Sequence, residues 1–299
     1  MVRLFLVLPI ALLLGGCIKS MAVNALGDAL ANGGGTYARD DDPDLVAAAT
    51  PFGLKTIESL LDAEPEHRGL LLAAARGFTQ YGYAFTQVEA DYVEARDFDA
   101  AQHLRRRAKR LYVRARDYGV RGLEVEHAGF LAGLRGDRKA TLADLEGEDV
   151  PLLYWTATAW AAAVALDKDD AEMAADLDLV EAMMERAFAL DPQHGRGALH
   201  DFYVAWFGGR PEAAGGSDAK ARAHMEASLR DSQGKRIAPL VSFAETVCVK
   251  RQQKDEFAAL LARALAFDPD ASPPDRLANL IAQKRARWLL TQRDDLFLE

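Results

Sequence analysis

Apolar residues recur at spacings of three and four along almost the whole chain, which is the pattern of amphipathic α-helices. Ala and Leu dominate, and few segments show the alternation of a half-buried strand. Gly, Pro and Asp residues stand where the pattern breaks, as expected at helix ends. Helices are predicted over residues 43–63, 69–96, 99–123, 151–166, 170–190, 197–207, 218–231, 237–249, 255–267 and 274–290. The sequence therefore indicates an all-α fold.

Several of these helices carry a spacing typical of the second helix of a tetratricopeptide repeat, with small and large residues at fixed places before a closing Pro. The matching positions are Ala108, Tyr112 and Ala115; Val180, Met184, Ala187 and Pro192; and Phe257, Leu261, Ala264 and Pro269. The repeats are degenerate, because their period is 40 and then 37 residues, measured between Ala187, Ala227 and Ala264. We predict a single solenoid-like domain of tetratricopeptide-like helical repeats, with a plain helical bundle as the alternative.

The first residues are typical of a secretory signal peptide: a basic start at Arg3, an apolar run over 4–14, and small residues before Cys17. The run is too short to cross a bilayer, which needs about 20 apolar residues. Its ending, Leu14-Gly15-Gly16-Cys17, resembles a bacterial lipobox. We therefore predict cleavage before Cys17 and attachment of lipid to it, since several acyl chains give a stable membrane anchor.

The predicted organisation is a lipoprotein signal peptide over 1–16, a lipidated Cys17 with a short helix and a Gly-rich turn over 17–43, and the helical-repeat domain over 44–299. The protein would then be lipid-anchored in a bacterial envelope and face the periplasm. Ile18, in place of an Asp, favours the outer over the inner membrane. The formal charge of −9, from 36 basic and 45 acidic residues, argues against a nucleic-acid partner.

Segments spread over the chain resemble the TatT family, the lipoprotein T component of certain tripartite ATP-independent periplasmic (TRAP) transporters. They are residues 24–30 with Gly33-Gly34-Gly35, residues 40–43, 70–87 (LLLAAARGFTQYGYAFTQ), 150–155, 197–200 and 277–280. The resemblance implies a helical repeat fold, a homotrimer with a central pore, and association with a periplasmic solute-binding P component. It also implies a role in ligand delivery, including delivery of hydrophobic ligands. The family requires no catalytic motif, and we expect neither an enzyme nor a cofactor.

Aromatic residues on the helix predicted over 69–96 share one face, and such a stripe can line an apolar passage. Core packing against the next helix explains the same stripe. Trp155, on an uncharged helix, could face a cavity, and His200 lies in a segment that resembles the family. The candidate ligand or pore surface consists of Phe78, Tyr81, Phe85, Tyr92, Trp155 and His200.

Other chemistry is weakly indicated. The helix over 99–123 is rich in Arg, and this run is interpreted as a solvated face, with a docking patch for an acidic partner or lipid headgroup as the alternative. The six His residues show no zinc spacing, and Cys248, among apolar neighbours, is predicted to be a buried thiol.

The preferred hypothesis is a transport accessory that binds a solute-binding protein and guides an apolar ligand. A scaffold lipoprotein for envelope machinery is the alternative.

Overall fold

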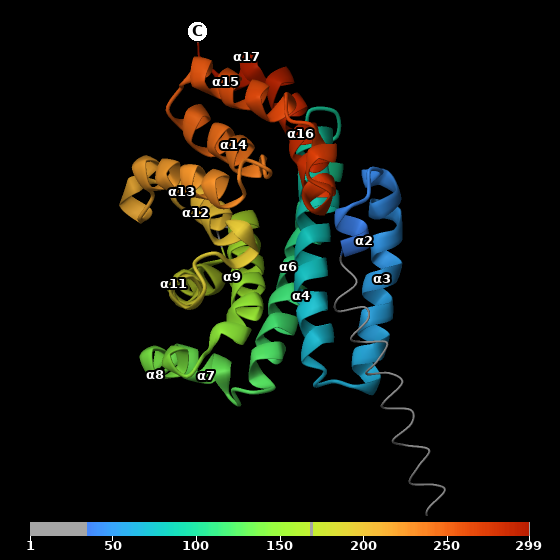
Figure 1. The fold of residues 1–299 in the computed structure, drawn as a ribbon, viewed down its shortest axis with the longest axis vertical. Helices are drawn as coiled ribbons and strands as arrows, with labels where there is room; N and C mark the ends of the chain where they lie inside the picture. Colours follow the sequence, from blue (N-terminus) through green and yellow to red (C-terminus); the bar gives the residue numbers. More distant parts are fainter. Residues whose placement is uncertain (1–34, 168–169, 299) are drawn as a thin grey trace, which may run out of the picture.

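The computed structural model describes residues 35–167 and 170–298 (Figure 1). The predicted signal peptide, Cys17 and the short helix before Gly33 lie outside the described residues. The main helices are α2 (Gly35–Ala38), α3 (Pro43–Ala63), α4 (Arg68–Gly82), α5 (Val88–Glu94), α6 (Phe98–Glu124), α9 (Val150–Leu166), α11 (Leu177–Leu190), α12 (Ala198–Gly208), α13 (Asp218–Asp231), α14 (Ala238–Phe243), α15 (Lys254–Leu265) and α16 (Arg276–Thr291). Since no strand occurs in the described ranges, the all-α prediction is confirmed.

Helix starts follow the expected capping chemistry. The Asp42 carboxylate accepts hydrogen bonds from the backbone N–H groups of Asp44 and Leu45, both at 3.0 Å, and Pro43 occupies the first turn of α3. Ser217 caps α13 by accepting from the N–H of Lys220 at 3.3 Å. Four short helices were not predicted: α2, α7 (Phe130–Arg135), α8 (Arg138–Ala143) and α17 (Arg293–Leu296). The helix predicted over 170–190 is divided into α10 (Ala171–Ala175) and α11. Helices of four to six residues are too short to show the recurring spacing of three and four on which the prediction depends.

Two of the predicted helices contain a π-helical turn. The helix predicted over 69–96 consists of α4, the π turn η1 (Tyr83–Gln87) and α5, and the one predicted over 237–249 consists of α14 and the π turn η5 (Ala244–Cys248). In η1, the hydroxyl of Thr86 donates to the carbonyl of Tyr81, five residues back. A Thr hydroxyl that bonds to an upstream carbonyl is a known cause of local helix distortion. Thr is common in ordinary helices, so the sequence alone does not reveal the turn.

Consecutive helices pack against one another along the chain: α3 with α4, α4 with α6, α6 with α9, α9 with α11, α12 with α13, and α14 with α15. Figure 1 shows this succession as an arc from the blue α3 to the red α16. The repeat positions named above lie inside it, and Ala108, Ala187 and Leu261 are fully buried. The tetratricopeptide-like interpretation remains a prediction, as does the division of the chain into segments.

The two ends of the arc meet, which an open solenoid would not require. Helix α16 packs on α2 and α3 (Figure 1), and the guanidinium of Arg276 donates to the carbonyl of Arg39 at 3.0 Å. Ion pairs also join α16 to α5: Lys284 to Glu89 at 2.6 Å and Arg285 to Asp91 at 2.8 Å. The C-terminal helix thus closes the arc on the N-terminal helices.

Among the described residues, no helix combines the length and the apolar character needed to cross a membrane.

Candidate functional site

Two of the predicted surface aromatics belong to the core between α4 and α6. Phe78 is buried and its ring stacks on that of Tyr118, with ring centroids 5.9 Å apart. Tyr81 is also buried, and its hydroxyl accepts a hydrogen bond from Arg107 at 3.3 Å. Phe85, half-buried in η1, packs against Tyr81 with centroids 5.9 Å apart. These three residues therefore lie where the core-packing alternative places them.

Tyr92 lies apart from those three, where α5 meets α16. Its ring is 5.4 Å from that of Trp288, and the guanidinium of Arg285 stacks on Trp288 at 4.2 Å. Burial raises the pKa of Tyr92 to about 12, so the hydroxyl stays protonated. We call the group of Asp91, Tyr92, Glu245, Arg285 and Trp288 the closing seam.

Arg285 is the centre of the closing seam. Its side chain is 8% exposed and forms ion pairs with Asp91 from α5 and Glu245 from η5. Burial lowers the pKa of Arg285, but the adjacent carboxylates of Glu245 and Asp91 outweigh burial and the net shift is upward. One cation thus joins three elements that are far apart in the sequence.

The seam extends outward through a second Arg. Arg105, from α6, donates to Asp91 at 3.0 Å and to Glu94 at 2.6 and 2.7 Å. The hydrogen bonds to Glu94 raise the pKa of Arg105, which stays charged. Asp91 is therefore shared between two guanidinium groups. This sharing could not be predicted from the local sequence, because the partners of Asp91 lie on α6 and α16.

Trp155 and His200 occupy two further places. Trp155 is half-buried on α9, and its ring meets that of Tyr154 edge-on, with centroids 4.9 Å apart. His200, on α12, faces His224 of α13, and their Nδ1 atoms are 2.7 Å apart. The six predicted residues are therefore divided among four places rather than forming one surface.

The two imidazoles form a pair inside an aromatic cluster. His224 stacks on Tyr203 and Phe207, at centroid distances of 4.7 and 5.7 Å, and Phe188 meets His200 edge-on at 5.1 Å. Burial, together with the nearby His200 and Lys220, lowers the pKa of His224 to about 4. Burial also lowers the pKa of His200, although the Asp231 carboxylate, 3.6 Å from Nε2, opposes this shift. Sequence reasoning selected His200 but not its partner.

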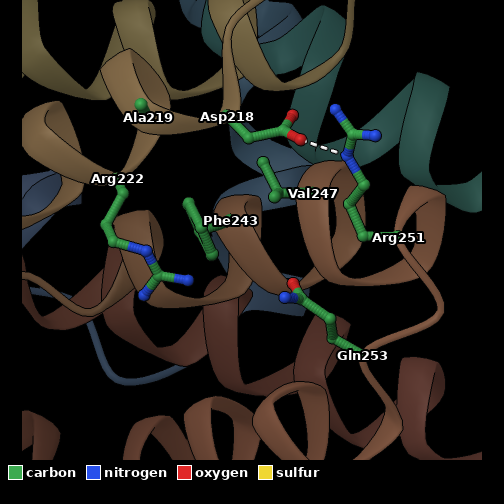
Figure 2. A pocket seen from close by; sticks show the side chains of 7 residues that line it. All are labelled: Asp218, Ala219, Arg222, Phe243, Val247, Arg251 and Gln253. Carbon is green, nitrogen blue, oxygen red and sulfur yellow. Dashed lines mark hydrogen bonds and ion pairs between the residues drawn. The ribbon is translucent and has the colours of Figure 1, made fainter.

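A surface hollow of about 360 Å³ lies between α13, α14 with η5, and the start of α15 (Figure 2). Ala219, Phe243 and Val247 are its apolar side chains. The guanidinium of Arg222 lies 4.6 Å above the Phe243 ring and forms two hydrogen bonds with Glu256, at 2.7 and 2.9 Å. On the other side, Arg251 pairs with Asp218, as the dashed line in Figure 2 shows. The charges around this hollow are thus already paired within the chain.

A second hollow, of about 380 Å³, lies on the outer side of α6. Three of its six lining residues are basic: Arg110, Arg114 and Arg121. Tyr118 and Val113 supply its apolar surface. This hollow belongs to the Arg-rich helix identified in the sequence, and most of its charge is of one sign.

One group of side chains has the composition of a metal site. Ligand atoms of Glu126, His127 and Asp149 lie within 4.8 Å of one another. The guanidinium of Arg68, however, pairs with Asp149 and lies 3.4 Å from Glu126. Arg68 therefore supplies the positive charge that a metal ion would otherwise supply to these carboxylates, and the group is an ion-pair cluster.

The thiol of Cys248 is unreactive because it is buried and protonated. Cys248 is fully buried in η5, and burial raises its pKa to about 12, so the nucleophilic thiolate is not formed near neutral pH. This agrees with the prediction of a buried thiol.

Comparison with known proteins assigns the chain to a family. Residues 39–297 match the family described as TRAP transporter T-component. The chain belongs to this family. An uncharacterized protein of Treponema pallidum (strain Nichols) is similar to it, with 33% identity over 267 residues, which cover 88% of this chain and 83% of that protein. The resemblance seen in the sequence is thus confirmed, and the TRAP transporter T-component family is one of transport accessories rather than enzymes.

Proposed function

We propose that this chain is the lipid-anchored, periplasm-facing T component of a TRAP-type transport system and that it binds the periplasmic solute-binding protein of that system. The observation that carries the proposal is the family match over residues 39–297. The lipobox-like ending at Cys17 supports a membrane anchor, with the outer membrane favoured over the inner. A component held at the membrane and facing the periplasm is in a position to meet a soluble solute carrier.

The proposal includes a role in guiding an apolar ligand through the pore of a homotrimer, as the family resemblance implies. Of the aromatics first considered, Phe85, Tyr92 and Trp155 support this role best, because each is only half-buried. Phe78 and Tyr81 are committed to the core and contribute stability instead.

A tetratricopeptide-like scaffold for envelope machinery is the second candidate. The succession of packed helices and the buried residues at the repeat positions favour it. In addition, the hollow in Figure 2 is open to the surface and edged by paired charges, which suits a segment of another protein better than a small apolar ligand.

The test is affinity capture of the full-length lipidated protein from solubilised native membranes, with mass spectrometry of the co-purifying proteins. We expect a solute-binding protein in stoichiometric amount, and light scattering of the purified protein should then give the mass of a trimer. Co-purification of outer-membrane assembly or cell-wall proteins in its place would contradict the transport role and support the scaffold.

A further inference from the structure

Four exposed arginines share one face of helix α6. Arg106, Arg110, Arg114 and Arg121 are all exposed, and their spacings of four, four and seven residues place them on one face of the helix. We call this set the α6 arginine stripe. The opposite faces of α6 are buried against α4 and α9, so the stripe is carried by a rigid element.

The stripe has a charge opposite to that of the rest of the chain. Helix α6 carries seven Arg and one Lys against three acidic residues, whereas the whole chain has a net charge of −9. Within the described ranges, Arg106 and Arg110 form no ion pair, and Arg114 lies 3.4 Å from Glu58. The charges of Arg106 and Arg110 are therefore available to a partner, whereas Arg114 also faces Glu58 and Arg121 donates to the carbonyl of Pro65 at 3.1 Å.

Aromatic rings hold two of the guanidinium groups in place. Arg114 lies over the Phe78 ring at 5.3 Å, and Arg121 lies over the Tyr118 ring at 5.3 Å. Tyr118 also lines the hollow on the outer side of α6, next to Arg110. A guanidinium held in one orientation presents its planar fork to a carboxylate with little loss of side-chain entropy.

We propose that the α6 arginine stripe docks an acidic surface of a protein partner, whose carboxylates lie about one helical turn apart. The proposal rests on the proposed function, since it takes that partner to be the periplasmic solute-binding protein and names the chemistry of the contact. Charge complementarity to an exposed stripe mainly raises the rate of association and fixes the orientation of the partner.

A lipid surface fits the stripe less well than an acidic protein. Helices that lie in a bilayer interface bury an apolar face among the lipids, but the apolar faces of α6 are already covered by α4 and α9. The large apolar side chains exposed at the two ends of α6 are Phe98 and Val125, and neither lies within the stripe.

The test compares two charge-matched double variants of the full mature protein. Arg106→Glu/Arg110→Glu reverses two stripe charges, whereas Lys139→Glu/Arg263→Glu reverses two exposed charges on α8 and α15, outside the stripe. The affinity for the purified solute-binding protein is measured by titration at low and at moderate salt. We expect the stripe variant to bind at least about tenfold more weakly and to lose most of the salt dependence, and the control to change less than about twofold.

A second probe separates the stripe from the identity of the partner. A helical peptide with Glu at every fourth position should bind the wild type and the control but not the stripe variant, and its Gln counterpart should bind none of them. If the solute-binding protein does not bind the wild type while this peptide behaves as expected, the proposed function fails and the stripe still recognises acidic protein.

Three results would overturn the proposal for the stripe. The first is equal binding of the solute-binding protein to both double variants, which would leave the transport role intact. The second is stripe-dependent binding to anionic phosphatidylglycerol vesicles with no binding of the acidic peptide. The third is an oligomer of the wild type that only the stripe variant loses, because the occupant of the stripe would then be a second copy of the chain.

Discussion

The contact between α6 and α9 and the closing seam hold the same fold together by opposite means. Between α6 and α9 the contact is made at a glycine. A Cβ atom on Gly119 would come within 2.1 Å of the Thr156 hydroxyl oxygen, so the backbone of α6 packs directly against the Thr156 side chain of α9. In the closing seam the contact is a buried cation, Arg285, held between two carboxylates and stacked on an indole ring.

The difference lies in what each contact requires of its neighbours. Close packing of small residues needs only the right size at each place, and dispersion and the hydrophobic effect then stabilise it. A buried ion pair needs every partner, because a charge left alone in a low-dielectric site costs several kcal/mol. We therefore expect the first contact to fail through added volume and the second through a lost partner.

The largest effect is expected for Gly119→Leu. The new side chain has no room against Thr156, so α6 and α9 must separate, and the free energy of unfolding should fall by about 3 kcal/mol. Urea denaturation followed by circular dichroism measures it. Gly147→Ala is the control, because a Cβ atom there meets nothing within 4 Å, and it should change stability by less than about 0.5 kcal/mol. Equal stability of Gly119→Leu and wild type would show that this contact is loose.

These two regions also mark what the sequence could predict. The repeat spacing selected Ala108, Tyr112 and Ala115 as matching positions, and all three are buried. A local rule suffices there, because the residues that share a helix face are three or four positions apart. Helix caps such as Ser217 could be predicted for the same reason, since the partner is three residues away.

The closing seam could not be predicted, because its members come from separate parts of the chain. Asp91 and Arg285 are 194 positions apart, and nothing in the local pattern around either residue names the other. The same limit applies to the aromatic stripe: one helix face could be recognised, but whether it met solvent or α6 depended on tertiary packing. His200 was selected without His224 for that reason as well.

In the closing seam, Arg285→Met should lower the free energy of unfolding by about 2 kcal/mol, because it leaves Asp91 and Glu245 without their shared cation. Both carboxylates are partly exposed, so the loss stays below that for a fully buried pair. Chemical denaturation measures the change. Adding Glu245→Gln to Arg285→Met should recover part of it, and a double variant less stable than Arg285→Met alone would contradict the ion-pair account.

The histidine pair predicts a dependence of stability on pH. The pKa of His224 is about 4 in the folded protein and near 6.5 when unfolded, so between these values the unfolded chain binds more protons and stability falls as pH is lowered. The carboxylate of Asp231 favours protonation of His200 before His224. Protonation of His224 as well would place two imidazolium cations in contact. These pKa values alone would give a loss of about 3 kcal/mol from pH 7 to pH 4. Because the imidazole of His224 is only half-buried, solvent screening reduces the expected loss to about 1 to 2 kcal/mol.

His224→Phe tests this dependence while keeping an aromatic ring beside Tyr203 and Phe207. Unfolding free energies at pH 4, 5, 6 and 7 should show a slope smaller than that of wild type by the contribution of one histidine. His103→Gln, at an exposed position on α6, is the matched control and should leave the slope unchanged. An unaltered slope in His224→Phe would mean that the pair does not govern the response to acid.

The smallest effect is expected for Lys284→Met, one residue before Arg285 on the same helix. Lys284 also forms an ion pair across the seam, with Glu89 at 2.6 Å, but its side chain is 53% exposed and the pair is screened by water and salt. Stability should fall by no more than about 0.5 kcal/mol, and even that difference should vanish in about 0.5 M salt. Differential scanning calorimetry at both salt concentrations measures it. Should Lys284→Met cost as much as Arg285→Met, the burial of the guanidinium would not be what distinguishes the two pairs, and closure of the arc would depend on total charge across the seam.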